Sequence, residues 1–234
     1  MEDFNEIIYR LNKISNKWIP SHRRSDTGIG KTLEDLLGIK ENNFPWSDGE
    51  DVEIKSIRKN SSSMISLFTK TPSPASSIKM LLDEYVYYSD ENPGVKILYV
   101  DLYGNRYTTI NGVPSLMLKV TPNKINIMNL DKKVYGGWSY EALRSSFESK
   151  LGRVLLVKAD SRFKDGREEF NYNEAWVLEG FSFNRFIKMI KKGIIKVEIR
   201  IGSYPNGSPH DHGTGFRILE RNLQDCFLYR KRII

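Results

Sequence analysis

The strict alternation of apolar and charged residues between positions 194 and 201 is the feature that most restricts how this chain can fold. The isoleucines and the valine at odd positions fall on one face of an extended segment, whereas Lys196, Glu198 and Arg200 fall on the other. A shorter stretch from Asp51 to Ile57 repeats the pattern. Each stretch predicts a strand whose apolar face packs on a core, so the chain has to build a sheet.

Helical periodicity is interspersed among these strands. Apolar residues from Phe4 to Trp18 recur at helical intervals, and Pro20 ends that helix. Residues 51–70 are expected to form a β-hairpin because a polar turn separates two strand-like runs. Further helices are expected at 31–37, 77–88, 139–149 and 182–192, further strands at 95–103, 106–110, 115–120, 124–129 and 153–159, and a loop rich in glycine and proline at 202–215. Since strict β–α–β alternation is missing, the sequence predicts an α/β or mixed α+β fold around a mixed sheet.

Composition and charge narrow the class of protein. The 234 residues carry 36 Lys and Arg against 29 Asp and Glu, a net charge of +7. The apolar run Val154–Val157 is too short to span a membrane, and the N-terminus opens acidic, unlike a signal peptide. The single cysteine, Cys226, excludes an intrachain disulfide and a cysteine-rich zinc site. We therefore expect a soluble cytoplasmic protein whose basic excess favours a polyanionic partner.

The segment Gly28-Ile-Gly-Lys-Thr32 invites comparison with a nucleotide-binding P-loop. That motif needs a further glycine at the position that Ser25 occupies here, and it follows an apolar strand, which is missing before residue 25. A glycine turn that leads into a short helix explains the segment better. Lys31, at the start of that helix, is one of the cations expected to contact a polyanion.

Glu53 and Lys55 are the first candidates for catalytic chemistry. Alternation places their side chains on the same face of a strand, about 6–7 Å apart. Glu53 with a second carboxylate can hold Mg²⁺, and Lys55 can orient the attacking water or stabilise developing charge. Asp48 and Asp51 are both candidates for the second ligand, and spacing does not decide between them. The alternative interpretation is a solvated strand face that carries an ordinary ion pair.

Acidic residues crowd around this pair. Glu34, on the short helix just upstream, adds another carboxylate to those of the strand. Carboxylates that lie this close repel one another unless a cation binds among them. This argument favours a Mg²⁺ site over a solvated face.

A second group of polar residues lies near the end of the chain. His210, Asp211, His212 and Arg217 follow the loop, and Glu198 and Arg200 lie on the strand before it. Arginine pairs bidentately with guanine, and histidine or glutamate can read other base edges, so these residues suit recognition in the major groove. A zinc site is less favoured because only Asp211 offers a third ligand nearby. A surface loop with a satisfied charge network is the remaining alternative.

Taken together, these segments resemble the MvaI/BcnI restriction endonucleases, relatives of the mismatch-repair nicking enzyme MutH, and the MvaI branch in particular. By that resemblance Asp48, Glu53 and Lys55 match the catalytic residues, with Asp48 and Glu53 as metal ligands. Glu34 matches an accompanying glutamate, and Lys70 matches a catalytic lysine. Residues 198–217 match base-reading groups. The resembling segments are Thr27–Leu37, Asp51–Ser56, Leu67–Pro72, Ile195–Tyr204 and His210–Ile218.

The resemblance also implies a fold and an activity. It implies a PD-(D/E)xK fold of one domain, 1–234, whose catalytic lobe (centred on 20–90) and recognition lobe (centred on 190–220) clamp duplex DNA. The implied activity is Mg²⁺-dependent cleavage of CC(N)GG-type sites by a monomer, one strand at a time, in a host that carries a matching DNA methyltransferase. Two positions depart from the MvaI pattern, since Glu198 replaces a shorter aspartate and Gly215 replaces an alanine. A MutH-like nicking enzyme and a DNA-binding module without catalysis are the alternatives.

Overall fold

The computed structural model describes residues 4–39, 52–59, 61–88 and 94–234, apart from the side chains of 148–150. The chain divides into two compact units, and each is described by itself. Unit 1 comprises residues 1–65, 147–182 and 220–234, and unit 2 comprises residues 66–146 and 183–219. None of the helices in the described ranges combines the length and the hydropathy that a membrane crossing requires.

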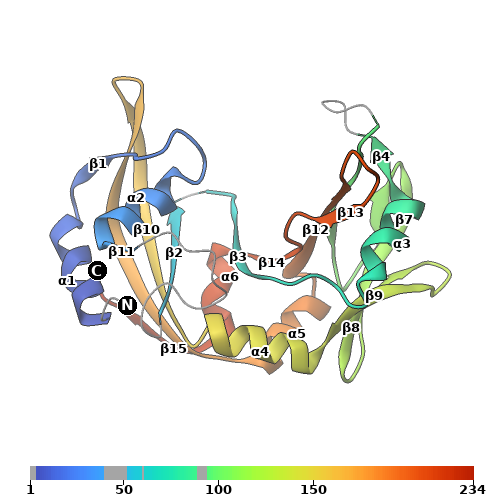
Figure 1. Ribbon diagram of the computed structural model, residues 1–234. Helices are drawn as coiled ribbons and strands as arrows, with labels where there is room; N and C mark the ends of the chain where they lie inside the picture. The colour runs from blue at the N-terminus through green and yellow to red at the C-terminus, as the bar shows by residue number, and fades with distance from the viewer. Residues whose placement is uncertain (1–3, 40–51, 60, 89–93) are drawn as a thin grey trace. The chain divides into compact units, whose positions relative to one another are not determined.

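Unit 1 is built on a five-stranded sheet of order β1-β11-β10-β2, with β15 pairing to a different stretch of β11 (Figure 1). β2 runs parallel to β10, while β10 and β11 form a long antiparallel hairpin, so the sheet is mixed. The elements of unit 1 are α1 (Phe4–Ile14), β1 (Trp18–Pro20), α2 (Gly28–Leu37), β2 (Glu53–Arg58), β10 (Arg153–Lys164), β11 (Arg167–Phe181), α6 (Glu220–Leu223), the 3-10 helix η1 (Gln224–Cys226) and β15 (Phe227–Arg232).

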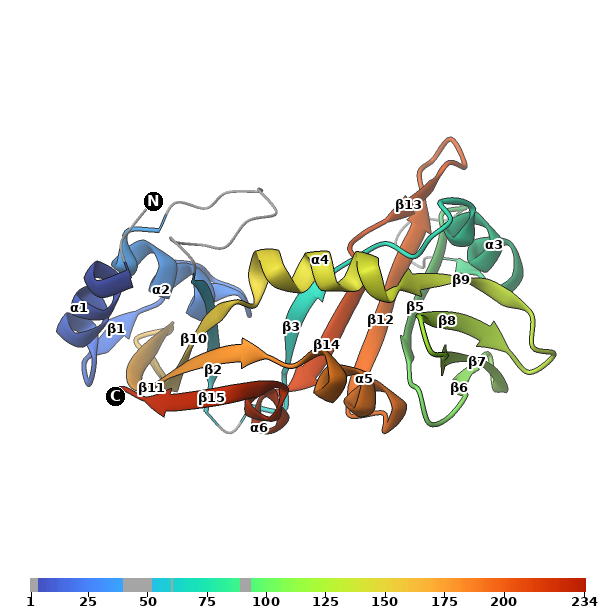
Figure 2. The ribbon, with the colours of Figure 1, turned by 90° about the horizontal axis from the view of Figure 1, so that it is seen from below.

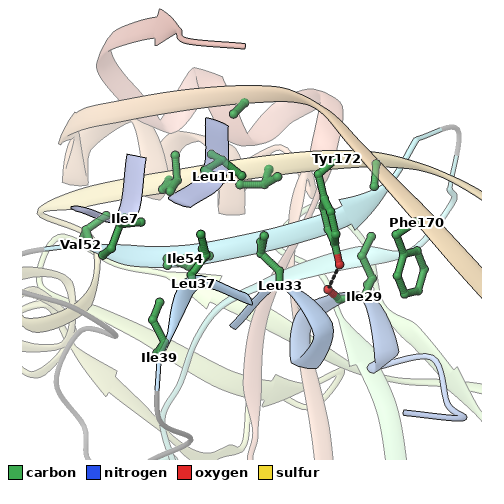
Figure 3. Close-up of a cluster of buried hydrophobic side chains, with 14 residues drawn as sticks. Ile7, Leu11, Ile29, Leu33, Leu37, Ile39, Val52, Ile54, Phe170 and Tyr172 are labelled. Carbon is green, nitrogen blue, oxygen red and sulfur yellow. Dashed lines mark hydrogen bonds between the residues drawn. The ribbon is translucent and has the colours of Figure 1, made fainter. Parts of the chain in front are cut away.

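The core of unit 1 lies where α1 and α2 pack against this sheet (Figure 3). Ile7 and Leu11 of α1 and Leu33 and Leu37 of α2 are fully buried, as the helical spacing of apolar residues predicts. The sheet contributes side chains from β2, β10 and β11. One polar group enters the core, since the hydroxyl of Tyr172 donates a hydrogen bond to the carbonyl of Ile29, 2.8 Å away.

Unit 2 contains two sheets, of order β3-β14-β12-β5-β4, with β13 pairing to β12, and β6-β7-β8-β9 (Figure 2). Its core includes a group of aromatic rings around Phe216, which stacks on Phe68 at 4.6 Å and meets Trp138 edge-on at 5.1 Å. The elements of unit 2 are α3 (Ser76–Tyr85), β4 (Tyr87–Tyr88), β5 (Lys96–Leu102), β6 (Thr108–Ile110), β7 (Val113–Val120), β8 (Lys124–Asn129), β9 (Val134–Ser139), α5 (Phe183–Lys191), β12 (Ile195–Ser203), β13 (Pro209–Asp211) and β14 (Gly215–Leu219). β3 (Met64–Thr69) and α4 (Tyr140–Lys150) each span a boundary between the units.

The mixed α+β class is confirmed, and α5 lies where periodicity predicts a helix. The N-terminal helix predicted to run from Phe4 to Trp18 ends at Ile14, and Trp18–Pro20 form the strand β1. The hairpin expected at 51–70 is wrong, because its two strands belong to different sheets. β2 pairs with β10, about 100 residues further along, and β3 joins the sheet of β14. The glycine turn at 28–30 is also wrong, since α2 already begins at Gly28. A short strand, β13, interrupts the loop expected at 202–215.

Candidate active site and nucleic-acid interface

β2 positions Glu53 and Lys55 through its parallel pairing with β10, in which Glu53 lies opposite Val154 and Lys55 opposite Leu156. Ile54, between them, points into the core of unit 1, so the two charged side chains lie on the other face of the strand. The ammonium of Lys55 contacts Oε1 of Glu53. The predicted same-face pair is therefore present.

Both members of this pair are largely withdrawn from water. The side chain of Glu53 is 8% exposed and that of Lys55 is 18% exposed. Burial of charged groups costs free energy, and a solvated strand face would avoid that cost. The pair thus does not fit the alternative interpretation of a solvated face. A nearly buried carboxylate beside a cation is a typical setting for catalytic chemistry.

Both candidates for the second carboxylate of the predicted metal site, Asp48 and Asp51, lie outside the described residues. Among the described residues, no three possible metal-ligating side chains come together. Glu53 itself fits Mg²⁺, because a carboxylate oxygen is the hard ligand that this ion prefers. The pairing of Glu53 with Asp48 stays a prediction.

Glu34 lies on α2, near Gly30. A Cβ atom placed on Gly30 would lie 3.9 Å from Oε1 of Glu34 and 3.5 Å from Oγ of Ser56. The absence of a side chain at Gly30 therefore leaves room for both groups. The catalytic role of Glu34 stays a prediction.

The segment Gly28–Thr32 forms the first turns of α2 and does not form a phosphate loop. Thr32 is fully buried, and its hydroxyl accepts a hydrogen bond from the backbone N–H of His22. The ammonium of Lys31 lies 2.9 Å from Oδ1 of Asp35. The hydrogen bonds of His22 and then of Lys31 hold the pKa of Asp35 below its usual value. These contacts agree with the rejection of a P-loop.

Lys70 belongs to unit 2, whereas Glu34, Glu53 and Lys55 belong to unit 1. Both polar groups of the Lys70 backbone form hydrogen bonds. The N–H of Lys70 donates to the carbonyl of Thr214 at 2.9 Å, and its carbonyl accepts from the indole N–H of Trp138, also at 2.9 Å. Its role as a catalytic lysine stays a prediction.

The charged face of β12 carries Glu198 and Arg200, as the alternation predicts. Glu198 lies directly opposite Gly215 on β14. Its Oε2 atom lies 2.7 Å from Nη2 of Arg217, and each of the two side chains is about a quarter exposed. Within the described part of the chain Nε of Arg217 has no hydrogen-bond partner. Arg200 is exposed. Glu198 and Arg217 thus form an ion pair rather than two independent charged groups.

His210 and His212 lie close together at the end of β12, with their rings 4.4 Å apart and perpendicular. The Nδ1 atom of His210 shares a 2.8 Å hydrogen bond with the hydroxyl of Tyr204. Burial, followed by the neighbouring His210 and Arg200, lowers the pKa of His212, which favours its neutral form. A neutral imidazole both donates and accepts hydrogen bonds, as recognition of base edges requires.

Asp211 makes hydrogen bonds chiefly within its own loop. Its Oδ1 atom accepts hydrogen bonds from the N–H groups of Gly213 and Thr214 and from the hydroxyl of Thr214. Its Oδ2 atom accepts one from Thr71. No third metal ligand joins the two histidines among the described residues. The carboxylate thus fixes the loop, and base reading by Asp211 stays a prediction.

The structure adds two residues that the sequence reasoning missed, Thr71 and Gly202. A Cβ atom on Gly202 would lie 3.1 Å from Nε2 of His212, so the absence of a side chain there lets the imidazole lie against β12. Thr71 falls inside the segment Leu67–Pro72, where the sequence singles out only Lys70. Neither position carries a distinctive signal in a single sequence, because the role of Thr71 depends on Asp211, 140 residues away, and that of Gly202 on how the chain folds back to place His212.

Comparison with known proteins agrees with these observations. The model of the MvaI/BcnI restriction endonuclease family matches residues 8–227. Among solved structures, the restriction endonuclease MvaI in complex with its cognate DNA is 28% identical, with a TM-score of 0.84 and 100% of both chains covered. MvaI without DNA is also 28% identical, with a TM-score of 0.62 over 100% of this chain and 99% of that one. No curated protein matches the chain.

Proposed function

This chain belongs to the MvaI/BcnI restriction endonuclease family and is a type II restriction endonuclease, and we propose that it cleaves duplex DNA with Mg²⁺ at a short CC(N)GG-type site, one strand at a time. The observation that carries the catalytic part is the Glu53–Lys55 pair, nearly buried on β2. The family match supplies the substrate class, because the matching MvaI structure contains cognate DNA.

In the proposed mechanism Glu53 and Asp48 hold Mg²⁺, which supplies a Lewis acid for the scissile phosphate and a more acidic attacking water. Lys55 keeps its ammonium beside the Glu53 carboxylate, where it positions the water and offsets the charge that develops on the phosphate. The resemblance to the family supports Glu34 and Lys70 as accompanying catalytic residues. The products carry a 5′-phosphate and a 3′-hydroxyl.

We assign base reading to unit 2. Glu198, Arg200, Arg217 and the neutral imidazole of His212, with His210 beside it, present donors and acceptors that suit the edges of G·C pairs. Asp211 is included in this group, and Lys31 contacts the DNA backbone from unit 1. Since cations contact phosphates, binding weakens steeply as salt rises. The enzyme acts as a monomer in the cytoplasm, and its host carries a cytosine methyltransferase that protects the same site.

Incubation of the protein with supercoiled plasmid and Mg²⁺ tests this proposal. Discrete fragments that vanish with a chelator and in Glu53→Gln and Lys55→Met are expected. Glu141→Gln changes an exposed carboxylate in α4 and serves as the control. Open circles without linear product would support a MutH-like nicking enzyme instead. Sequence-specific binding with no cleavage would support a module that has lost catalysis, and fragments that persist in Glu53→Gln would refute the catalytic assignment.

A further inference from the structure

The side chains of Tyr204 and His210 meet at the end of the β12–β13 hairpin in unit 2. The hydroxyl of Tyr204 lies 2.8 Å from Nδ1 of His210, and the centroids of the two rings are 4.7 Å apart. Tyr204 is not among the residues assigned to base reading. It nevertheless makes a direct hydrogen bond to one of them.

The turn that joins β12 to β13 fixes this contact. Its loop has three residues, because the N–H of Tyr204 donates to the carbonyl of Ser208 and the N–H of Gly207 donates to the carbonyl of Tyr204, both at 2.8 Å. Gly207 has a φ angle of 82°, the left-handed conformation that the last residue of such a loop adopts. The register of the strands then places His210 opposite Gly202. Tyr204 and His210 are therefore diagonal neighbours across the hairpin, a separation that aromatic side chains can bridge.

His210 belongs to the face of the sheet that carries the charged residues of β12. Glu198, Arg200 and Gly202 share one face of that strand, and His210 shares it too because it lies directly opposite Gly202. His210 is partly exposed, and its Nε2 atom has no hydrogen-bond partner within the described ranges. Since Nδ1 is bonded to Tyr204, Nε2 is the ring nitrogen that remains for a ligand.

Acid and base strength decide which partner donates in the bond between Tyr204 and His210. A phenol is a stronger acid than the N–H of a neutral imidazole, and an imidazole nitrogen is a stronger base than a phenol oxygen. The hydroxyl therefore donates to Nδ1, which accepts through its lone pair. A neutral imidazole carries a single N–H group, so that group lies at Nε2. His210 thus offers a donor, rather than an acceptor, to a ligand on this face.

A donor at Nε2 distinguishes between the two bases of a G·C pair. In the major groove guanine offers the acceptors N7 and O6, whereas cytosine offers the donor N4. An imidazole that exchanges freely between its two tautomers binds either edge. An imidazole that is held with its N–H at Nε2 binds only the guanine edge.

We propose that Tyr204 is a positioning residue that holds the ring of His210 in one orientation, with its N–H at Nε2, so that His210 donates to N7 or O6 of a target guanine. The inference rests on the proposed function, since it needs DNA on this face of unit 2. Tyr204 acts through His210 and itself touches no base. It affects which base edge His210 binds and has no part in the cleavage step.

The first test measures the tautomer of His210 in the protein without DNA. Nitrogen-15 NMR of the imidazole rings at mildly alkaline pH separates protonated from unprotonated nitrogens, and His210→Gln assigns the signals. In the wild type, Nδ1 of His210 should be unprotonated and Nε2 protonated. In Tyr204→Phe the two signals should move toward each other, because the ring exchanges between its tautomers. A protonated Nδ1 in the wild type overturns the inference.

The second test measures affinity for target duplexes in which one guanine at a time carries a weaker acceptor, with Ca²⁺ in place of Mg²⁺. The replacements are 7-deazaguanine, which lacks N7, and 6-thioguanine, whose sulfur replaces O6. The wild type should lose about fivefold in affinity at one guanine, the effect of one neutral hydrogen bond. At that guanine His210→Ala should lose nothing further, and Tyr204→Phe should lose less than about twofold. A loss that depends on His210 but appears when a cytosine lacks its N4 amino group overturns the inference.

Tyr9→Phe is the matched control. It removes the hydroxyl of a tyrosine of similar exposure, 54% against 48% for Tyr204, on α1 of unit 1. This variant should keep every wild-type affinity and the wild-type NMR signals of His210. Urea unfolding of Tyr204→Phe, His210→Ala and Tyr9→Phe checks that each variant is folded.

The outcomes separate this inference from the proposed function. Failure of the wild type to bind or cut any duplex refutes the proposed function and with it the guanine contact, while the NMR signals still report the tautomer. Normal cleavage, together with a wild-type loss at the modified guanine in Tyr204→Phe, overturns the inference alone. An equal loss of affinity in Tyr204→Phe for every duplex, modified or not, also overturns it, because Tyr204 would then act without selecting a base edge.

Discussion

The hydroxyl of Thr71 donates a 2.7 Å hydrogen bond to Oδ2 of Asp211, joining residues 140 positions apart in the sequence. Beside it, the N–H of Lys70 donates to the carbonyl of Thr214. The loop that contains the two histidines is therefore bonded to the segment that carries the predicted catalytic lysine. A change in the loop on DNA binding would reach the backbone of Lys70 directly.

Replacement of Asp211 by alanine should lower the free energy of unfolding by about 2–3 kcal/mol, because three donors in the loop lose their acceptor. Thr71→Val, which removes a single hydrogen bond, should cost about 1 kcal/mol. Urea unfolding measures both values. Asp131→Ala, at an exposed turn residue, is the control and should cost little. Unchanged stability of Asp211→Ala with loss of sequence specificity would instead identify Asp211 as a base reader.

Lys55→Met leaves the nearly buried Glu53 carboxylate without its cation. The variant should lose about 2–3 kcal/mol of stability in metal-free buffer, since an unpaired buried charge is costly. Mg²⁺ should then raise its melting temperature more than that of the wild type, because the ion no longer competes with an ammonium for the carboxylate. Glu53→Gln should show the smallest shift with Mg²⁺. Equal shifts in all three proteins would argue that Glu53 is no metal ligand.

The stability of unit 1 should fall in acid through Glu174. Burial alone would raise the pKa of this carboxyl, but hydrogen bonds from Trp176 and Lys158 lower it from 4.5 to about 2. Since the folded pKa is the lower one, the stabilisation is complete above pH 4.5 and is lost as the pH falls toward 2. The loss should reach ~3 kcal/mol.

Glu174→Gln should remove this part of the acid dependence and cost stability at pH 7. Unfolding in urea at a series of pH values between 2 and 7 measures it, with Glu141→Gln as the control. If Glu174→Gln and the wild type lose stability in parallel between pH 4.5 and 2, another carboxyl is responsible.

The two glycines Gly215 and Gly137 should respond oppositely to alanine. A Cβ atom on Gly215 would lie 3.7 Å or more from its neighbours, with Nε of Arg217 at 3.8 Å, so Gly215→Ala should change stability by less than about 0.5 kcal/mol. A Cβ atom on Gly137 would lie 2.0 Å from the carbonyl of Ile125, and Gly137→Ala should cost about 3 kcal/mol. Thermal unfolding compares the two, and a destabilised Gly215→Ala would show that the Glu198–Arg217 pair needs the open space.

The local sequence pattern was sufficient to predict strands that have one buried face. The alternation around Glu198 and around Glu53 identifies β12 and β2 and assigns their faces, because burial follows a period of two in a regular strand. β11 was missed although it is a central strand. Its register shifts between Lys158 and Ala159 of β10, so that Asn173 is left over and the period breaks in the middle of the strand.

Contacts between distant segments could not be predicted in the same way. The turn at 59–63 indicates a hairpin between β2 and β3. In the structure β2 pairs with β10 instead, and only the folded sheet decides between these two partners. In the candidate site too, some features follow from the local sequence and others depend on contacts between distant segments. The Glu53–Lys55 pair follows from its spacing, whereas the bond between Thr71 and Asp211 and the room that Gly202 leaves for His212 depend on strands that meet only after folding.

Unit 1 is built from three separate segments of the chain. This arrangement determines when its strands become available to pair during synthesis. β11, in the middle segment, pairs with β15, in the last one, through contacts such as Trp176 with Arg232. The sheet that carries Glu53 therefore cannot be completed until the ribosome has also made unit 2. A chain released at Leu219 should be protease-sensitive and inactive on plasmid. A nascent chain of this design completes the sheet that carries Glu53 only after β15 has been made.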